Sequence, residues 1–286
     1  MSLGRRGAEG FTLVELIVAM SILAILAAMG AVFIRPIIDA YVAQQTRAEL
    51  TDVADTAMRR MSRDVRLALA NSVRVTTPGN VYLELLLTRT GGRYRSEFGP
   101  SVGEDPLTFS AADGQFDTLG RLSTLAGQTI VTASDRVVVH NLGIANADAY
   151  AGNNTSLINA FTPNGGPAGN ADRIAIAAWQ FPLESPGRRF SVISGPVTYE
   201  CTGVGTAGGN GTGQLRRHDG YGINAAAPVA PPTANPPILA RYVSGCTINY
   251  ALLALQARGL VAIRLDLTRN GETVSLYQEV HVNNVP

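Results

Sequence analysis

Residues 10–34 read GFTLVELIVAMSILAILAAMGAVFI, and this run decides how the rest of the chain is organised. Arg35 and Pro36 follow it, and Glu15 is its only charged residue. As a helix rising about 1.5 Å per residue, the run is about 36 Å long, which exceeds the roughly 30 Å hydrocarbon core of a bilayer. We therefore predict a membrane-spanning helix.

The carboxylate of Glu15 is the unusual feature of this apolar run. An ionised carboxylate is costly in lipid, so acidic side chains within a span commonly pair with another group and serve a function. The run contains no Lys, Arg or His, so no residue three or four positions away offers an opposite charge. We expect the partner of Glu15 to come from elsewhere.

Gly10 and the FTLVEL that follows it resemble the prepilin signal of type IV pilins and type II secretion pseudopilins. The resemblance covers the basic leader with Arg5 and Arg6, the Gly, the Phe, the Glu and the long apolar run. One departure concerns proline. Major pilins usually kink their helix within the apolar run, whereas the first proline here is Pro36, at its end.

This resemblance implies a role for each motif residue. Gly10 would end a leader of residues 1–10 that a prepilin peptidase removes, and Phe11 would become an N-methylated N-terminus. Glu15 would pair with the Phe11 amine of a neighbouring subunit as the segment 11–35 joins a filament. Two charges that are each costly in lipid would then offset one another.

Two other interpretations of the run remain. It could be an ordinary secretory signal peptide cleaved near Ala27-Ala28, although apolar regions of such peptides span about 7–15 residues and this one is longer. It could also be a simple signal anchor, with Glu15 at the headgroup boundary, where burial costs little.

Composition limits the remaining possibilities. The chain has 286 residues, of which 46% are hydrophobic and 16% charged, with a net charge of +1. Outside the membrane span, this length allows one sizeable core or two small ones. A near-neutral balance argues against a dedicated nucleic-acid binder, which needs a basic face.

The two cysteines are Cys201 and Cys246. In a domain exported across the membrane, we expect them to form a disulfide. Free buried thiols are the alternative.

The helix is predicted to continue over residues 36–71 as an amphipathic segment. Apolar residues recur at helical spacing, and charged residues occupy the opposite face. The apolar stripe comprises Ile37, Ile38, Tyr41, Ala48, Val53, Ala54, Ala57, Met58, Met61, Val65 and Leu69. Leu69 would be the last helical residue.

Residues 72–286 change to β-type alternation and turn residues. The predicted strands are residues 73–77, 81–88, 107–110, 129–132, 136–140, 173–182, 189–194, 197–201, 260–268 and 274–282. Pro78-Gly79-Asn80, Gly91-Gly92, 111–114 and Asn270-Gly271 are predicted turns, the last being a strong type I′ hairpin signal. Residues 141–170 are predicted as loop.

Residues 202–245 form the least regular segment, predicted as a loop that the cysteines close. It contains Arg216, Arg217 and His218, which could contact an acidic partner or DNA, although a solvated loop is the simpler interpretation.

Two further segments resemble one group of minor pilins. RGLVAIRLDLTRNGETVSLYQEVHVNNVP, residues 258–286, resembles the C-terminal hairpin of minor pilins of the mannose-sensitive haemagglutinin type. RRMSRDVRLALANSVRV, residues 59–75, is similar to the helix end of the same group, which in turn resembles J-type minor pseudopilins.

The sequence contains only weak signals for a metal, nucleotide or catalytic site. The histidines His140, His218 and His281 stand far apart without metal-ligand spacing. Gly203 to Gly208 fits G-x-G-x-x-G, but the glycine-rich sequence after it cannot open the helix that a dinucleotide site needs. Asp113, Asp117 and Asp148 could bind calcium, but EF-hand spacing is absent. We expect no cofactor and no enzyme activity.

The sequence thus predicts an α+β protein with a long N-terminal helix packed on a mainly antiparallel sheet. The resemblance implies a minor pilin or minor pseudopilin in or at the tip of a type IV pilus or type II secretion pseudopilus. It would be single-pass in the inner membrane with a periplasmic domain, and then part of the filament at the cell surface. Expected partners are prepilin peptidase, other pilins, the inner-membrane assembly platform and membrane lipid. The alternative is an anchored tip adhesin or DNA-uptake receptor that binds through residues 202–245.

Overall fold

The computed structural model describes residues 10–77, 79–122, 129–167, 170–227, 233, 235–252 and 258–286. Contacts divide the chain into two compact units, Met1–Glu49 and Leu50–Pro286. The leader arginines Arg5 and Arg6, Pro78 of the first predicted turn and part of the proline-rich segment before Pro237 lie outside the described residues.

The helix α1 (Leu13–Arg66) contains 54 residues and continues through Pro36. It begins beside Thr12, whose Oγ1 accepts a hydrogen bond of 3.3 Å from the backbone N–H of Glu15. Thr12 therefore acts as the N-cap residue, since a cap side chain satisfies one of the free N–H groups of the first turn.

The helix ends at Arg66 rather than at the predicted Leu69. The N–H of Leu69 donates instead to the carbonyl of Leu86 at 2.8 Å, so this residue already belongs to the turn that leads into the sheet. Asn71 then adopts a φ of 59°, a left-handed conformation that Asn tolerates better than most residues.

In the unit Met1–Glu49, the helix exposes an apolar surface. Its most apolar 18-residue window has a mean hydropathy of 2.7, and none of that window is buried. By length and composition, this helix can cross a membrane. Part of the predicted apolar stripe is exposed and lies outside the observed core, so the prediction was wrong for Ile37, Ile38, Tyr41, Ala48 and Val53.

The unit Leu50–Pro286 contains an antiparallel sheet with a branched strand order. Its main path is β13-β12-β11-β10-β7-β4-β5-β6-β3, and β2 pairs with both β1 and β7, whereas β8 and β9 form a separate two-stranded sheet. The strands are β1 (Arg74–Thr76), β2 (Val81–Arg93), β3 (Asp113–Asp117), β4 (Arg136–Val139), β5 (Thr155–Thr162), β6 (Arg173–Trp179), β7 (Arg189–Thr202), β8 (Thr206–Ala207), β9 (Asn210–Gly211), β10 (Gly213–His218), β11 (Ile238–Leu252), β12 (Arg258–Arg269) and β13 (Glu272–Asn283).

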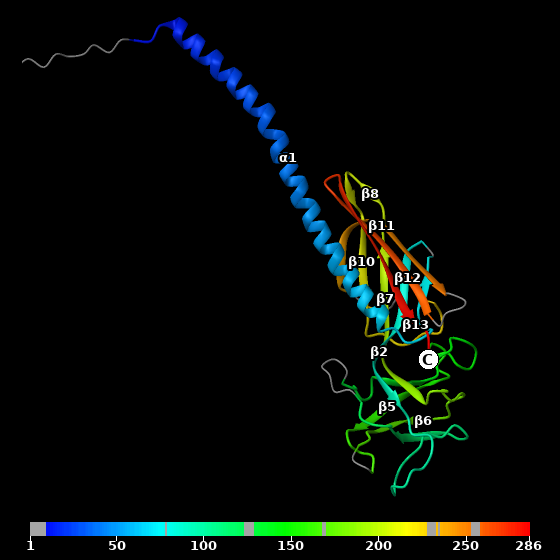
Figure 1. The fold of residues 1–286 in the computed structure, drawn as a ribbon. Helices are drawn as coiled ribbons and strands as arrows, with labels where there is room; N and C mark the ends of the chain where they lie inside the picture. Colours follow the sequence, from blue (N-terminus) through cyan, green and yellow to red (C-terminus); the bar gives the residue numbers. More distant parts are fainter. Residues whose placement is uncertain are drawn as a thin grey trace, which may run out of the picture. The chain divides into compact units, whose positions relative to one another are not determined.

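The long strand β7 organises this sheet. β2 pairs along almost its whole length, while β10 and β4 pair with its C-terminal and N-terminal parts. The sheet therefore has one part that contains β10 to β13 and another that contains β3 to β6, joined by β2 and β7 (Figure 1).

The first part packs against the end of α1 through a stripe with helical spacing (Figure 1). Its buried helix residues are Leu50, Ala54, Ala57, Met58, Met61 and Val65. They meet buried side chains of β2, β7 and the strands β10 to β13. The predicted packing is confirmed for Ala54, Ala57, Met58, Met61 and Val65, and the predicted α+β fold is confirmed.

A second core lies among β3 to β6 and the adjoining ends of β2 and β7. Its aromatic rings include Phe116 and Phe190, whose centroids lie 5.3 Å apart in an edge-to-face arrangement. The chain therefore forms two main cores, one of the two possibilities that its length allows.

Three predictions about this second part were wrong. Gly91-Gly92 is not a turn, because β2 runs through it to Arg93. A Cβ on Gly91 would lie 2.9 Å from the carbonyl oxygen of Phe190, so this glycine allows β2 to approach β7 closely. The predicted loop 141–170 contains β5, and the two predicted strands 189–194 and 197–201 form the single strand β7.

Two of the shorter predicted strands are also absent. Residues 107–110 and 129–132 have no strand structure, whereas β3 begins at Asp113 inside the predicted turn.

The C-terminal hairpin forms as predicted. β12 and β13 pair from Arg258 opposite Asn283 to Arg269 opposite Glu272. Asn270 and Gly271 connect them with φ values of 53° and 79°, which is the left-handed pair that a type I′ turn requires.

The segment 202–245 is more regular than predicted. It contains the short hairpin β8–β9, the strand β10 and the beginning of β11. The G-x-G-x-x-G sequence leads into β8 and the turn of this hairpin, and no helix follows it.

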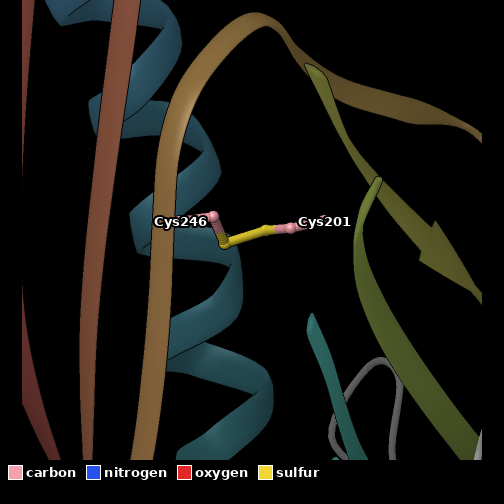
Figure 2. Close-up of a disulfide and its surroundings, with 2 residues drawn as sticks. All are labelled: Cys201 and Cys246. Carbon is pink, nitrogen blue, oxygen red and sulfur yellow. A yellow bond between two sulfur atoms is a disulfide. The ribbon is translucent and has the colours of Figure 1, made fainter. Parts of the chain in front are cut away.

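Cys201 of β7 and Cys246 of β11 form a disulfide, with Cα atoms 6.4 Å apart (Figure 2). In the strand order, β10 lies between these two strands. The bond therefore joins two strands that are not direct neighbours in the sheet path and closes a loop with a sequence separation of 45 residues.

Removing this disulfide is expected to destabilise the folded unit. Closing a loop of this length restricts the unfolded chain by about 4 kcal/mol in the chain-entropy treatment. We expect the double variant Cys201→Ala/Cys246→Ala to lose about that much unfolding free energy in denaturant titrations. Reductant should destabilise the wild-type protein similarly and leave the variant unchanged; equal stability of variant and oxidised wild type would contradict this expectation.

Candidate functional site

The residues that the sequence marks at the start of the apolar run lie at the beginning of α1. Gly10 and Phe11 precede the helix, and Glu15 lies in its first turn. All three are exposed, with 83% of the Phe11 surface accessible. A Cβ on Gly10 would meet nothing within 4 Å, so the chain itself places no steric demand on this position.

Glu15 has a local structural role as well as the predicted functional one. Thr12 and Glu15 have the spacing of a capping box, in which a Ser or Thr cap precedes a Glu or Gln by three positions. Only the bond from the Glu15 N–H to Thr12 is present. Among the described residues, the carboxylate of Glu15 has no hydrogen-bond or ion-pair partner.

The apolar surface that follows Glu15 is continuous along the first part of α1. Leu13, Val14, Leu16, Ile17 and many later apolar side chains are at least half exposed. Exposed apolar surface of this extent indicates contact with lipid or with other protein chains.

The predicted contact residues Arg216 and Arg217 lie on β10 rather than in a loop. Arg216 forms hydrogen bonds with Gln214 on its own strand. Arg217 has only 6% of its side chain exposed, and its Nε lies 2.9 Å from Oδ2 of Asp64. The interpretation of this pair as a solvated contact surface was therefore wrong for Arg217, which is an internal ion-pair residue.

Asp64 holds this internal cluster together, and the sequence analysis missed it. Its Oδ2 accepts hydrogen bonds from Arg217 and from the hydroxyl of Tyr199, the latter at 2.7 Å. Burial lowers the pKa of Arg217, but the hydrogen bond and charge of Asp64 outweigh burial and raise it overall. Burial and the Asp64 charge also raise the pKa of Tyr199, which keeps its hydroxyl protonated.

A signal for Asp64 exists in the sequence. It lies three residues after Met61 and beside Val65, on the apolar stripe of the helix. Because an acid on a buried face needs a partner, this position predicts a basic or hydroxyl group on the sheet opposite.

The histidines are separated, as predicted. His218 is buried with its Nε2 3.0 Å from Glu200, and His281 is exposed on β13. Within the described ranges, no three His, Cys, Asp or Glu side chains are grouped so that they could hold a metal ion.

Comparison with known families identifies the N-terminal segment. Residues 5–31 match the prokaryotic N-terminal methylation motif. Searches of curated proteins and of solved structures give no match. The matched residues include Gly10, Phe11 and Glu15 and most of the apolar run. The chain thus carries this motif at the start of a long apolar N-terminal helix that is followed by an antiparallel sheet, an arrangement consistent with the type IV pilin and pseudopilin superfamily.

Proposed function

We propose that this chain is a minor pilin or minor pseudopilin, cleaved by prepilin peptidase after Gly10 and methylated on Phe11. The observation that carries the proposal is the methylation motif at residues 5–31, joined to an exposed apolar helix whose Glu15 carboxylate has no partner in the part of the chain that the structure describes. A pilin is a structural subunit, so the chemistry of this site is processing and assembly.

Cleavage at Gly10 creates the group that Glu15 lacks. The new amine of Phe11 carries a positive charge. In the filament, the neighbouring subunit presents its Glu15 carboxylate at the same depth in lipid. Removing one partner of a buried charge pair costs about 3–5 kcal/mol, because the remaining charge stays buried without a partner. When a subunit joins the filament, an unpaired Glu15 carboxylate thus gains a partner, and this favours docking in register.

The rest of the proposal concerns the type of filament. The segments 59–75 and 258–286, which resemble minor pilins, form the end of α1 with the following turn and the β12–β13 hairpin. A disulfide suits an oxidising compartment, which supports a periplasmic position for the globular unit. Partners are then other pilins or pseudopilins, the inner-membrane assembly platform and membrane lipid.

The pairing role of Glu15 is tested by Glu15→Val. We expect this variant to be cleaved normally, because Gly10 and Phe11 are unchanged, and to enter filaments at a small fraction of the wild-type level. Filament counts by electron microscopy, with intact-mass analysis of the membrane fraction, measure the two steps separately.

Two matched variants separate pairing from helix capping. Glu15→Gln keeps a residue that suits the capping box but removes the charge, so we expect it to fail like Glu15→Val. Thr12→Ala removes the observed cap and keeps the charge, so it should assemble. Normal filaments from Glu15→Gln would count against charge pairing, and loss in Thr12→Ala alone would assign the effect to the cap.

A further inference from the structure

A cavity of about 490 Å³ in the unit Leu50–Pro286 is lined by arginines from three separate elements. Arg66 is the last residue of α1, Arg93 the last of β2 and Arg189 the first of β7. His140, directly after β4, also lines the cavity. Residues far apart in the sequence thus bring four basic side chains to one hollow.

The side chains that line this cavity carry unbalanced charge. No Asp or Glu side chain is among the lining residues. Within the described part of the chain, Arg66, Arg93 and Arg189 form no side-chain hydrogen bond or ion pair. Elsewhere in the same unit, Arg89, Arg173 and Arg217 are each paired with a buried aspartate. Those three arginines are largely buried, whereas Arg66, Arg93 and Arg189 are exposed, so their guanidinium groups stay accessible to a ligand in the cavity.

His140 adds one further observation at the same place. Its backbone has a φ of 50°, a left-handed conformation that Asn, Asp and His adopt more readily than other side chains. Its Nδ1 is buried without a hydrogen-bond partner among the described residues. Buried polar atoms are nearly always paired, so this unpaired nitrogen is unusual.

The neighbours of His140 hold it in this conformation. The side chain of Asn141 donates to the carbonyl of Ala70 at 2.7 Å and accepts from the N–H of Ala149 at 2.8 Å. The amide of Asn154 also contacts Asn141, at 3.2 Å. These buried bonds fix the backbone beside the histidine, so the site is formed before any ligand arrives.

We propose that this cavity binds a phosphate group, either inorganic phosphate or a phosphate monoester. A monoester carries about −1.5 to −2 charges and three acceptor oxygens, which suits several guanidinium groups approaching from different elements. A single carboxylate has one charge and two oxygens in one plane, so it would leave more of this positive charge uncompensated. The site lies on the globular unit and is separate from the methylation motif.

The test is isothermal titration of the full-length protein in detergent with inorganic phosphate, and separately with glycerol 3-phosphate. We expect saturable binding of at least one of them, and weakening by about tenfold or more in Arg93→Gln/Arg189→Gln. Tighter binding of glycerol 3-phosphate indicates an esterified ligand, and tighter binding of phosphate indicates the free ion. Glycerol should not bind.

Arg241→Gln is the matched control, since Arg241 is exposed on β11, unpaired among the described residues and outside the cavity. If circular dichroism shows that the double variant does not fold, Arg66→Gln replaces it in the titration, because Arg66 lies at an exposed helix end. The absence of saturable binding to wild type, or equal weakening in Arg241→Gln, would overturn the proposal.

Discussion

Replacing Gly10 with Asp is expected to leave the chain as an unprocessed precursor that enters no filament. Gly10 is exposed, and a side chain there would meet nothing within 4 Å, so the substitution does not disturb the fold of the chain. Any loss must therefore arise where the peptidase binds the peptide around Gly10. Intact-mass analysis of the membrane fraction should show the full-length chain in the variant and a chain without residues 1–10 in the wild type.

Gly30→Ala is the control for this experiment. Gly30 lies within the matched motif, and a Cβ there also meets nothing within 4 Å, but it is far from the proposed cleavage position. We expect its processing to be normal. Cleavage of the Gly10→Asp variant at the wild-type position would remove the proposed role of Gly10.

Replacing Asp64 with Ala is expected to cost about 3–5 kcal/mol of unfolding free energy, because a buried cation loses its main partner. Asp64 and Arg217 have side chains that are 3% and 6% exposed, and Tyr199 shares the same carboxylate. Asp219 remains beside Arg217, but that aspartate is 55% exposed. Guanidinium denaturation of the full-length protein in detergent, followed by circular dichroism, measures the loss.

Asp55→Ala provides the matched comparison on the same helix. Asp55 also pairs with an arginine, at 2.7 Å from Arg59, but both side chains are largely exposed. Surface pairs of this kind contribute at most about 1 kcal/mol. Similar losses from the two variants would show that burial does not set the strength of the Asp64 pair.

The sequence predicted the elements whose signals are local. The apolar run predicts the helix α1, although the cap at Thr12 was not predicted. Asn270-Gly271 specifies the C-terminal hairpin, because few other residue pairs tolerate two left-handed conformations. Local backbone preference decided each of these features.

Other features depend on contacts between distant residues and were missed. Gly91-Gly92 has the composition of a turn, but its role is to let β2 pass close to the backbone of Phe190. Arg217 has the residue type of a surface charge, but its buried partner Asp64, 153 residues away, makes its burial favourable. The arginines at the cavity are also unrecognisable in sequence, since Arg66, Arg93 and Arg189 meet only in the fold.

The most direct test of the proposed function is the N-terminus of the mature wild-type protein, determined by mass spectrometry of its terminal peptide from purified filaments. We predict that this peptide begins at Phe11 and carries one N-terminal methyl group. A mature chain beginning at any other residue, such as one near Ala28, would place the amine away from Glu15. That result would contradict assembly through this charge pair.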